Sequence, residues 1–402
     1  MSESGTRGGR RAISAGRSDI AATAAYYASS VVVGLGSAAL GPTLPALALQ
    51  TRVSLSQVGL LFTARSLGNL IGSALAASPL DRGRGRSLLA LALLASAGMT
   101  ALVPIAPHFL MLLLVFVLWG AAHAVISVGT NTLLVWTHGG RVGPFMNGLH
   151  FFFGVGSLVA PILVAQVLFL PRGVAWAYWI SALLTVPLSL LVLRLEIRSP
   201  SPSSRDAPPR PPDRLLFGFI ALFFFLYTGA EVGFGGWVFS WAVAEHGVSQ
   251  TVSAYLTSAF WGAFTLGRLV SIPLTIRIRA ERVLFGSLLG ALTSLALLLV
   301  LGGSKPVLWL GTVGAGLCMA YIFPGTLSFV QARVSITGRT ISRLFFCSSL
   351  GAMALPWLVG VLFGAFGPRA MIPALLIDLT LSLLVFALLC LSATGRHRLP
   401  AS

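Results

Sequence analysis

The succession of long apolar stretches is the feature of this chain that most restricts its fold. Twelve stretches of roughly 20–28 residues follow one another, and each is long enough to cross a hydrocarbon layer about 30 Å thick as an α-helix. Only 9% of the residues are charged, compared with about 25% in soluble proteins. The apolar runs are continuous rather than alternating with period two, which argues against a membrane β-barrel. The sequence therefore predicts an all-α membrane protein.

Twelve transmembrane helices with short connections account for nearly the whole chain. The first apolar stretch is too long for a signal-peptide core and has no convincing cleavage region, so we interpret it as the first membrane helix. A Gly-Pro-Thr-Leu-Pro run at 41–45 is expected to interrupt this helix near its outer end. The expected spans are about 22–49, 54–80, 87–106, 109–137, 142–170, 174–195, 215–243, 251–276, 282–303, 306–332, 340–366 and 370–393.

The distribution of arginine predicts how these spans are oriented. The loops on one side hold most of the arginines outside the termini, whereas no loop on the other side holds more than one lysine or arginine. This bias predicts that both termini are cytoplasmic. Because the basic residues flank apolar spans and form no separate patch, the net charge of +17 indicates a lipid bilayer rather than nucleic acid as the partner. The preference for arginine over lysine is typical of GC-rich bacterial genomes, so we expect a bacterial plasma (inner) membrane.

A proline- and serine-rich stretch at 196–214 divides the chain into two halves, 1–195 and 215–402, with six spans each. Its composition is typical of a solvated, semi-extended linker. An offset of about 195 residues maps Gly72 onto Gly267 and Gly156 onto Gly351, and Pro161 and Pro356 follow the second pair at equal distance. The halves are therefore predicted to be a duplicated six-helix unit.

The loop after the second span resembles a loop motif of the major facilitator superfamily, Gly-x-x-x-Asp-Arg-x-Gly-Arg-Arg. Ala77 stands where the family has its first glycine, and the second glycine comes one residue late. The resemblance implies a major facilitator fold, with two pseudo-symmetric six-helix bundles that expose a central site to each side of the membrane in turn. The matching residues are Asp81, Arg82, Gly83, Arg84, Gly85 and Arg86.

In that family the acid of this loop ties the end of span 2 to the start of span 11. The resemblance therefore implies that Asp81 faces Arg339 and Arg343, near a helix N-terminus where negative charge is favoured. A gating role follows for these three residues. For the three loop arginines, gating and simple enforcement of membrane orientation remain open alternatives: Arg82, Arg84 and Arg86.

Longer stretches resemble the fucose-permease-like branch, which includes proton-coupled sugar symporters and relatives of the animal sodium-dependent glucose transporters. These stretches are 147–161, 228–237, 254–262 and 267–268. The resemblance implies a sugar or sugar-like small molecule as substrate, with a proton or sodium as coupling ion. We expect no other cofactor and no metal site, because the three cysteines lie within apolar segments as packing residues.

Glu231 is the principal candidate for a coupling group. It follows Arg214 by 17 residues, which places it roughly 25 Å into the hydrocarbon layer at about 1.5 Å per residue. A carboxylate at that depth costs about 2.5 kcal/mol or more, so it is either protonated or retained for a function. The glycines at 229, 233 and 235 allow neighbouring backbones to approach it closely.

Two arginines also fall at membrane depth. Arg65 lies near the midplane in span 2, where an unpaired guanidinium must meet a carboxylate, carbonyls, water or the substrate. Pairing with Glu231 is one expectation, and structural and transport roles are both open. Arg268 falls in the inner half of span 8, where snorkelling or contact with carbonyls competes with a transport role.

Amide, imidazole and indole groups are the further candidates for contact with a sugar. Asn131, Asn147 and His150 are expected to form a polar cluster in the inner half of spans 4 and 5. Such groups both donate and accept hydrogen bonds, although interhelical bonding is an equal alternative. Trp237 and Trp261 provide flat faces that could stack on a pyranose ring.

Three further residues qualify this interpretation. His123 in span 4 is expected to be a packed histidine rather than a proton carrier. Asp378 lies in span 12, which is peripheral in the implied fold, so a binding role is not expected. Ser127 stands where related symporters can have an acid, which argues against a two-carboxylate mechanism.

The leading interpretation is a monomeric secondary active transporter of a sugar or small polar solute, working by alternating access as an ion-coupled symporter. A multidrug or metabolite efflux transporter of the same superfamily is the alternative, and a non-transporting receptor or scaffold is a third. An enzyme is not expected, because the sequence has no catalytic triad, His-Glu-x-x-His motif or paired acids at catalytic spacing.

Overall fold

The computed structural model describes residues 4–195, 214–331 and 338–395, and all regular structure in these ranges is helical. Twelve helices are long and apolar enough to cross a membrane, and none of their ends differs by more than three residues from the predicted spans. The predicted fold class is thus confirmed. The linker predicted at 196–214 lies outside the described residues apart from Arg214, which begins α8.

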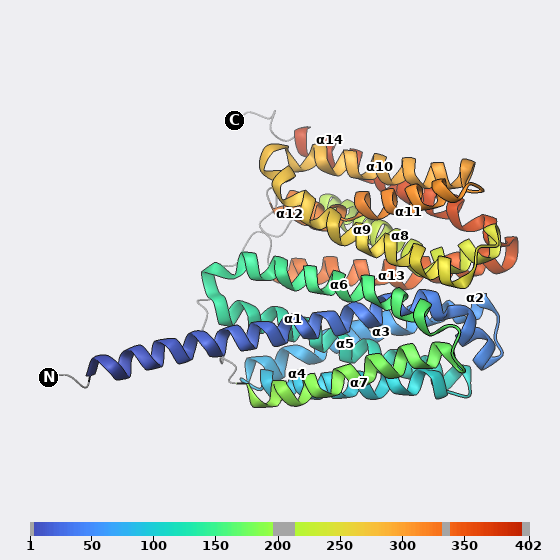
Figure 1. Cartoon of the computed structure of the whole chain (residues 1–402). Coiled ribbons are helices and arrows are strands. Elements are labelled where there is room, and N and C mark those ends of the chain that lie inside the picture. Colours follow the sequence, from blue (N-terminus) through green and yellow to red (C-terminus); the bar gives the residue numbers. More distant parts are fainter. Residues whose placement is uncertain (1–3, 196–213, 332–337, 396–402) are drawn as a thin grey trace.

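The helices form two groups that lie side by side (Figure 1). The first contains α1 (Ser4–Thr51), α2 (Leu55–Val58), α3 (Leu60–Asp81), α4 (Gly85–Leu102), η1 (Val103–Ile105), α5 (Phe109–His138), η2 (Gly139–Arg141), α6 (Val142–Val167) and α7 (Gly173–Arg194). The second contains α8 (Arg214–His246), α9 (Gln250–Arg277), α10 (Ala280–Leu301), α11 (Lys305–Met319), α12 (Ile322–Gln331), α13 (Gly338–Phe366), η3 (Pro368–Ala370) and α14 (Met371–Gly395). We call the end where α1 begins and α14 ends the termini end, and the opposite end the far end.

The same helix pairings recur in the two groups. Contacts of α1 with α6, α3 with α5 and α4 with α7 correspond to contacts of α8 with α13, α9 with α11 and α10 with α14. Between the groups, α3 contacts α13, α6 contacts α9, and α1 contacts α8. Each of these contacts maps onto another or onto itself when the chain is shifted by six spans. The two halves are therefore pseudo-symmetric, as the sequence predicts.

The paired glycines occupy equivalent places in this arrangement. A Cβ atom on Gly156 would overlap the backbone of Val31, and one on Gly351 would overlap the backbone of Phe225. Likewise, Gly72 lies against Ala121 and Gly267 against Leu317. Close approach of two membrane helices requires small residues at the crossing point, which explains why glycine recurs at these positions.

The first membrane helix is not interrupted at 41–45, which corrects the sequence prediction. Helix α1 continues through Pro42 and Pro45, and the Thr43 hydroxyl donates a hydrogen bond of 2.9 Å to the Ala39 carbonyl oxygen. The two prolines leave the carbonyl oxygens of Ala38 and Gly41 without their usual backbone donors, and membrane helices tolerate such prolines where neighbouring groups satisfy the freed carbonyls. Gly41 is used for close packing instead, because a Cβ there would meet the carbonyl oxygens of Gly235 and Gly236 in α8.

The tenth span contains a break that the sequence pattern did not reveal. Helix α11 ends at Met319, and α12 begins only at Ile322. Pro324 follows directly, and its nitrogen cannot donate the bond that a continuous helix would make to the Ala320 carbonyl. Broken helices at membrane depth are tolerated where protein groups satisfy the freed carbonyls.

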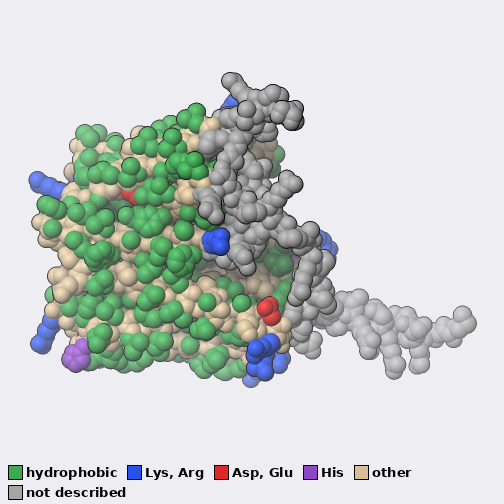
Figure 2. Space-filling view, turned by 180° about the vertical axis from the view of Figure 1, so that it is seen from behind, with side chains coloured by type: hydrophobic (Ala, Val, Ile, Leu, Met, Phe, Trp, Pro, Cys, Tyr) green, Lys and Arg blue, Asp and Glu red, His purple; other side chains and the backbone are tan. Residues whose placement is uncertain are grey.

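The outer surface suits a lipid environment. Figure 2 shows hydrophobic side chains over much of one face, with most of the visible lysines and arginines near the two ends of the molecule. Large apolar residues are strongly exposed on helices of both halves, for example Leu183, Leu222, Val300 and Leu391. In water such a surface would aggregate, whereas in a bilayer it contacts acyl chains.

The glycine crossings predict a position-specific effect on stability. Gly351→Ala should lower the melting temperature of the purified protein in detergent, at a cost of about 1–3 kcal/mol, because the new methyl group overlaps the Phe225 backbone. Gly286→Ala in α10 is the matched control, because no atom lies within 4 Å of a Cβ there. Equal melting temperatures for the two variants would contradict the packing described.

Candidate functional site

The two halves are joined mainly in their middle and toward the far end. The Thr63 hydroxyl in α3 donates to the Met353 carbonyl in α13 at 2.9 Å, and the Ser258 hydroxyl in α9 donates to the Leu158 carbonyl in α6 at 2.6 Å. The close contact of Gly41 with α8 lies in the same region. These contacts close the far side of the junction between the halves.

Two of the predicted gating residues, Asp81 and Arg343, form no ion pair with each other in the described structure. Both side chains are exposed. The side chain of Arg339 lies outside the described residues. The loop arginines are also exposed, and Arg86 makes only a long 3.5 Å hydrogen bond to the Leu195 carbonyl. The loop residues at the termini end are Arg82, Arg84 and Arg86.

Glu231 lies in α8, about one turn before Gly235 and Gly236, the residues that contact Gly41 of the other half. Its carboxyl group is half-buried and lies within hydrogen-bonding reach of the Tyr227 hydroxyl, one turn earlier on the same helix. It also interacts electrostatically with Arg268 of α9. The expected pairing with Arg65 is not made in this conformation, because the Arg65 side chain reaches α1 instead.

Tyr227 connects this carboxyl to the break in the tenth span. The side chain is fully buried, and its hydroxyl donates a 2.5 Å hydrogen bond to the carbonyl oxygen of Met319, the last residue of α11. Its ring stacks on Phe223. The sequence analysis did not select Tyr227, although its position four residues before Glu231 places both side chains on one helix face.

Arg268 and His150 meet at the contact between α9 and α6. The Arg268 guanidinium lies 4.5 Å above the centroid of the Phe264 ring, in a cation–π geometry, and its Nε has no hydrogen-bond partner in the described chain. It interacts electrostatically with His150 of the opposite half as well as with Glu231. Arg268 therefore lies near ionisable groups of both halves rather than snorkelling away from the site.

Arg65 lies deep in the first half, between α1, α3 and α5. Only 9% of its surface is exposed, and Nη1 donates a 3.0 Å hydrogen bond to the Ser37 carbonyl oxygen of α1. His123 of α5 is close enough to interact electrostatically. The Nε atom has no partner among the described residues.

The expected cluster of amides and imidazole is not assembled in this conformation. The Asn131 amide donates at 2.8 Å to the Ser127 carbonyl of its own helix. Asn147 and His150 are exposed on α6, and within the described residues no hydrogen bond joins any two of the three. His150 is instead within electrostatic reach of Arg268. One-dimensional depth estimates place residues at a level but not on a helix face, which explains the difference.

The two tryptophans have different surroundings. Trp237 is fully buried, its Nε1 donates at 2.8 Å to the Pro356 carbonyl, and its ring packs on Phe363. It leaves no free face for a solute in this conformation. Trp261 lies beside Phe264, and its Nε1 has no partner in the described structure.

Asn69 is a polar residue at membrane depth that the sequence analysis missed. It lies one turn after Arg65 on α3 and is half-buried, and no hydrogen bond to it is found in the described structure. Its carboxamide could have been recognised in the sequence as a polar group inside span 2. The spacing of four residues places it on the same helix face as Arg65.

The remaining polar residues are structural or unexplained. His123 shares a 3.0 Å hydrogen bond with the Ser96 hydroxyl and packs on Trp119, which agrees with the interpretation as a packed histidine. Asp378 is 6% exposed, and neither carboxyl oxygen has a partner in the described structure. We have no physical account of that residue.

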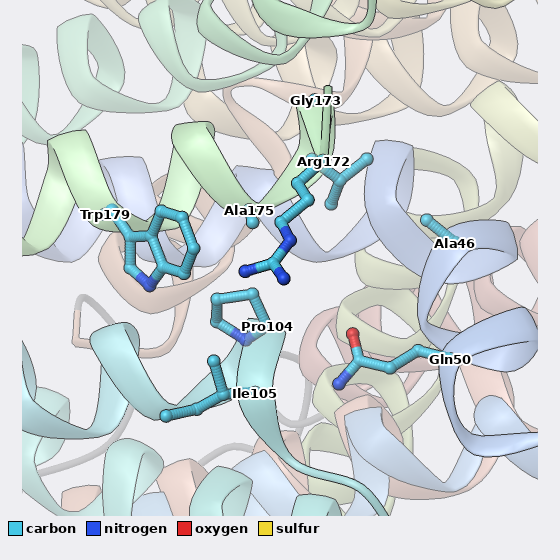
Figure 3. Close-up of a pocket in the computed structure, with 9 residues that line it drawn as sticks. Ala46, Gln50, Pro104, Ile105, Arg172, Gly173, Ala175 and Trp179 are labelled. Atoms are coloured by element: carbon cyan, nitrogen blue, oxygen red, sulfur yellow. The ribbon is translucent and has the colours of Figure 1, made fainter. Parts of the chain in front are cut away.

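A separate hollow of about 360 Å³ lies at the far end of the first half (Figure 3). The Arg172 side chain points into it, between Trp179 of α7 and Gln50 of α1. Gln50 donates to the Val103 and Ala106 carbonyls, so it stabilises the turn after α4. The hollow does not include any of the residues at the junction between the halves.

Residues 26–356 match the sequence profile of the Major Facilitator Superfamily. The chain belongs to this superfamily. It is therefore an integral, multi-pass membrane transporter of a small molecule, and not an enzyme.

Similar proteins agree with this assignment. The chain is 27% identical to sodium-dependent glucose transporter 1A of Mus musculus, over 84% of this chain and 88% of that protein. It is 28% identical to sodium-dependent glucose transporter 1 of Homo sapiens, over 84% and 73% of the two chains. A bacterial homologue of the human lysosomal transporter Spinster, in an inward-facing and occupied conformation, has the same fold, with a TM-score of 0.77 and 16% identity over 95% and 98% of the chains.

The closure at the far end predicts one-sided access to the site. In a background with all three cysteines replaced by serine, His150→Cys should react with a membrane-impermeant maleimide added from the termini side, because His150 is exposed. Ser258→Cys should be protected, because that side chain is 3% exposed and bonded to α6. Faster labelling of Ser258→Cys would contradict the described conformation.

Proposed function

We propose that the protein is a symporter that couples the uptake of a sugar or a similar small polar solute to a proton or a sodium ion. The observation that carries the proposal is the position of Glu231, at the junction of the two halves and beside Tyr227 and Arg268. The names of the mouse and human relatives support a glucose-like solute and sodium dependence. The efflux alternative has no specific support among these contacts.

Alternating access would use the pseudo-symmetry of the fold. The far end is closed by contacts between the halves, and rocking of one half against the other would break these contacts while joining the termini end. We propose that Asp81 then meets Arg343 and Arg339. The proposed orientation has the termini in the cytoplasm, of a bacterial plasma membrane, because arginine is concentrated in the loops at that end. One chain contains both halves of the site, so a monomer suffices.

We assign the solute contacts to side chains that remain available at the junction. Asn147 and His150 are exposed on α6, and Trp261 has an unpaired indole N–H. Asn131 retains its carbonyl oxygen as an acceptor, since only its amide nitrogen is used within its helix. For Trp237 we propose a role in closing the far side, because its ring lies beside Phe62 and against Gly59 of the first half.

Tyr227 provides a physical link between the ion and the movement. A phenol has one proton to donate, and here Tyr227 donates it to Met319. It can then only accept from Glu231, which requires a protonated carboxyl group. An ionised Glu231 would compete for the tyrosine proton and release the Met319 carbonyl at the break of the tenth span. A sodium ion bound to the carboxylate would remove this competition in the same way.

Glu231→Gln tests the coupling role. The amide keeps the size and hydrogen-bonding capacity of the side chain but does not bind a proton or attract a cation. In proteoliposomes we expect uptake driven by an imposed proton or sodium gradient to be lost, while exchange of labelled for unlabelled solute is retained. Full gradient-driven uptake by the Glu231→Gln variant would contradict the proposed coupling role.

Tyr227→Phe tests the link to the tenth span. The ring keeps its stacking on Phe223 but no longer donates to Met319, and we expect gradient-driven uptake to fall by about tenfold, as for the loss of one buried hydrogen bond. Tyr178→Phe is the matched control, because that buried hydroxyl bonds to Thr43 away from the site. An equal loss in both variants would show a general effect of removing a buried hydroxyl and would refute the specific link.

A further inference from the structure

The balance of charge at membrane depth restricts the chemistry of the solute. The chain has ten acidic residues, and only Glu231 and Asp378 lie in the interior of a span. Arg65, which is buried, and Arg268, which is half-buried, are the two arginines in the interior of a described span. Glu231 interacts with Arg268, and both carboxyl oxygens of Asp378 are without partners among the described residues. No carboxylate is therefore left to neutralise Arg65.

The unpaired arginine has a specific free edge. Nη1 is used by the Ser37 carbonyl, whereas Nε and Nη2 make no hydrogen bond within the described structure. Nε and Nη2 are the pair of parallel donors that binds both oxygens of a carboxylate at once. A neutral sugar hydroxyl would leave the positive charge uncompensated in a low-dielectric site.

Pseudo-symmetry shows that this charge is not required by the fold. Gly120 lies against the Arg65 backbone, and its counterpart Gly316 lies against the Phe260 backbone, so Arg65 corresponds to a fully buried phenylalanine. In α1 and α8 the shift is 194 residues, because Gly156 lies against Val31 and Gly351 against Phe225. This shift relates Ser37, the acceptor of Arg65, to Glu231. Arg65 in the first half and Glu231 in the second half are therefore ionisable groups that the duplicated unit does not share.

We propose that the solute carries a carboxylate, as in a sugar acid, and that Arg65 binds this group through its Nε–Nη2 edge in the loaded conformation. The inference rests on the proposed transport of a sugar-like solute. Nε is covered in this conformation, so the contact forms when the halves rearrange around the solute. Asn69, one turn away on the same face of α3 and without a hydrogen bond in the described structure, is placed to donate to the same carboxylate.

The test compares matched pairs of solutes that differ only in charge. Binding to the purified full-length protein is measured by calorimetry and by thermal shift for glucose against glucuronate, and for galactose against galacturonate. The inference predicts that at least one acid binds about 10- to 100-fold more tightly than its neutral partner, the range expected for a charge-assisted bidentate contact.

Arg65 variants assign the preference to this side chain. Arg65→Gln should remove the preference, so that the acid and the neutral sugar bind with similar affinity. Arg65→Lys should retain part of the preference, because lysine keeps the positive charge but lacks the two parallel N–H donors. Arg172→Gln, at the exposed hollow of the far end, should leave the preference intact. A purely structural role of Arg65 would change both affinities together.

The outcomes separate the two proposals. If a neutral sugar binds as tightly as its acid or more tightly, the anionic solute is refuted while sugar transport stands. If the acids bind and Arg65→Gln retains the preference, the assignment to Arg65 is refuted. If neither member of any pair binds, both the sugar acid and the proposed sugar-like solute are refuted.

Discussion

The exclusion of water from the hydrocarbon layer is the constraint on which the rest of this structure depends. It requires that backbone groups bond within helices, so the described membrane spans are helical apart from the break at Ala320 and Tyr321. It also makes each buried charge expensive unless another group compensates it. Arg268 has the carboxyl group of Glu231 within electrostatic reach, whereas the described hydrogen-bond partner of the Arg65 side chain is the Ser37 carbonyl oxygen. The chemistry proposed for this transporter follows from that difference.

Because the chain contains a duplicated six-helix unit, both halves satisfy this constraint with the same helix packing. Equivalent glycines bring equivalent helices into backbone contact, as at Gly156 and Gly351. Two such units can rock against each other without either unit being repacked internally. The two units share a fold, so the groups proposed to bind the ion and the solute must come from side chains that differ between them. The arginine of one half stands where the other half has Phe260, and the acid of that half stands where the first has Ser37.

Much of the fold could be predicted from the sequence because its strongest signals are periodic or long. The spans, the duplication and the depth of Glu231 need only hydropathy and counting. The partners of Glu231 could not be predicted, because they depend on which face of a helix points where. Depth alone suggested pairing with Arg65, whereas the helix faces bring Tyr227 and Arg268 to the acid. The break after Met319 was missed because Pro324 alone does not distinguish a kink from an interruption, as the continuous α1 with Pro42 and Pro45 demonstrates.

The central claim is that Glu231 couples the entry of an ion to that of the solute. The most direct measurement is the movement of the ion itself: an internal pH or sodium indicator in proteoliposomes to which a solute that binds is added without any imposed gradient. The account predicts that the solute drives protons or sodium inward with the wild-type protein, and that no ion movement accompanies solute entry with Glu231→Gln. Solute entry through the wild-type protein without movement of either ion would contradict it.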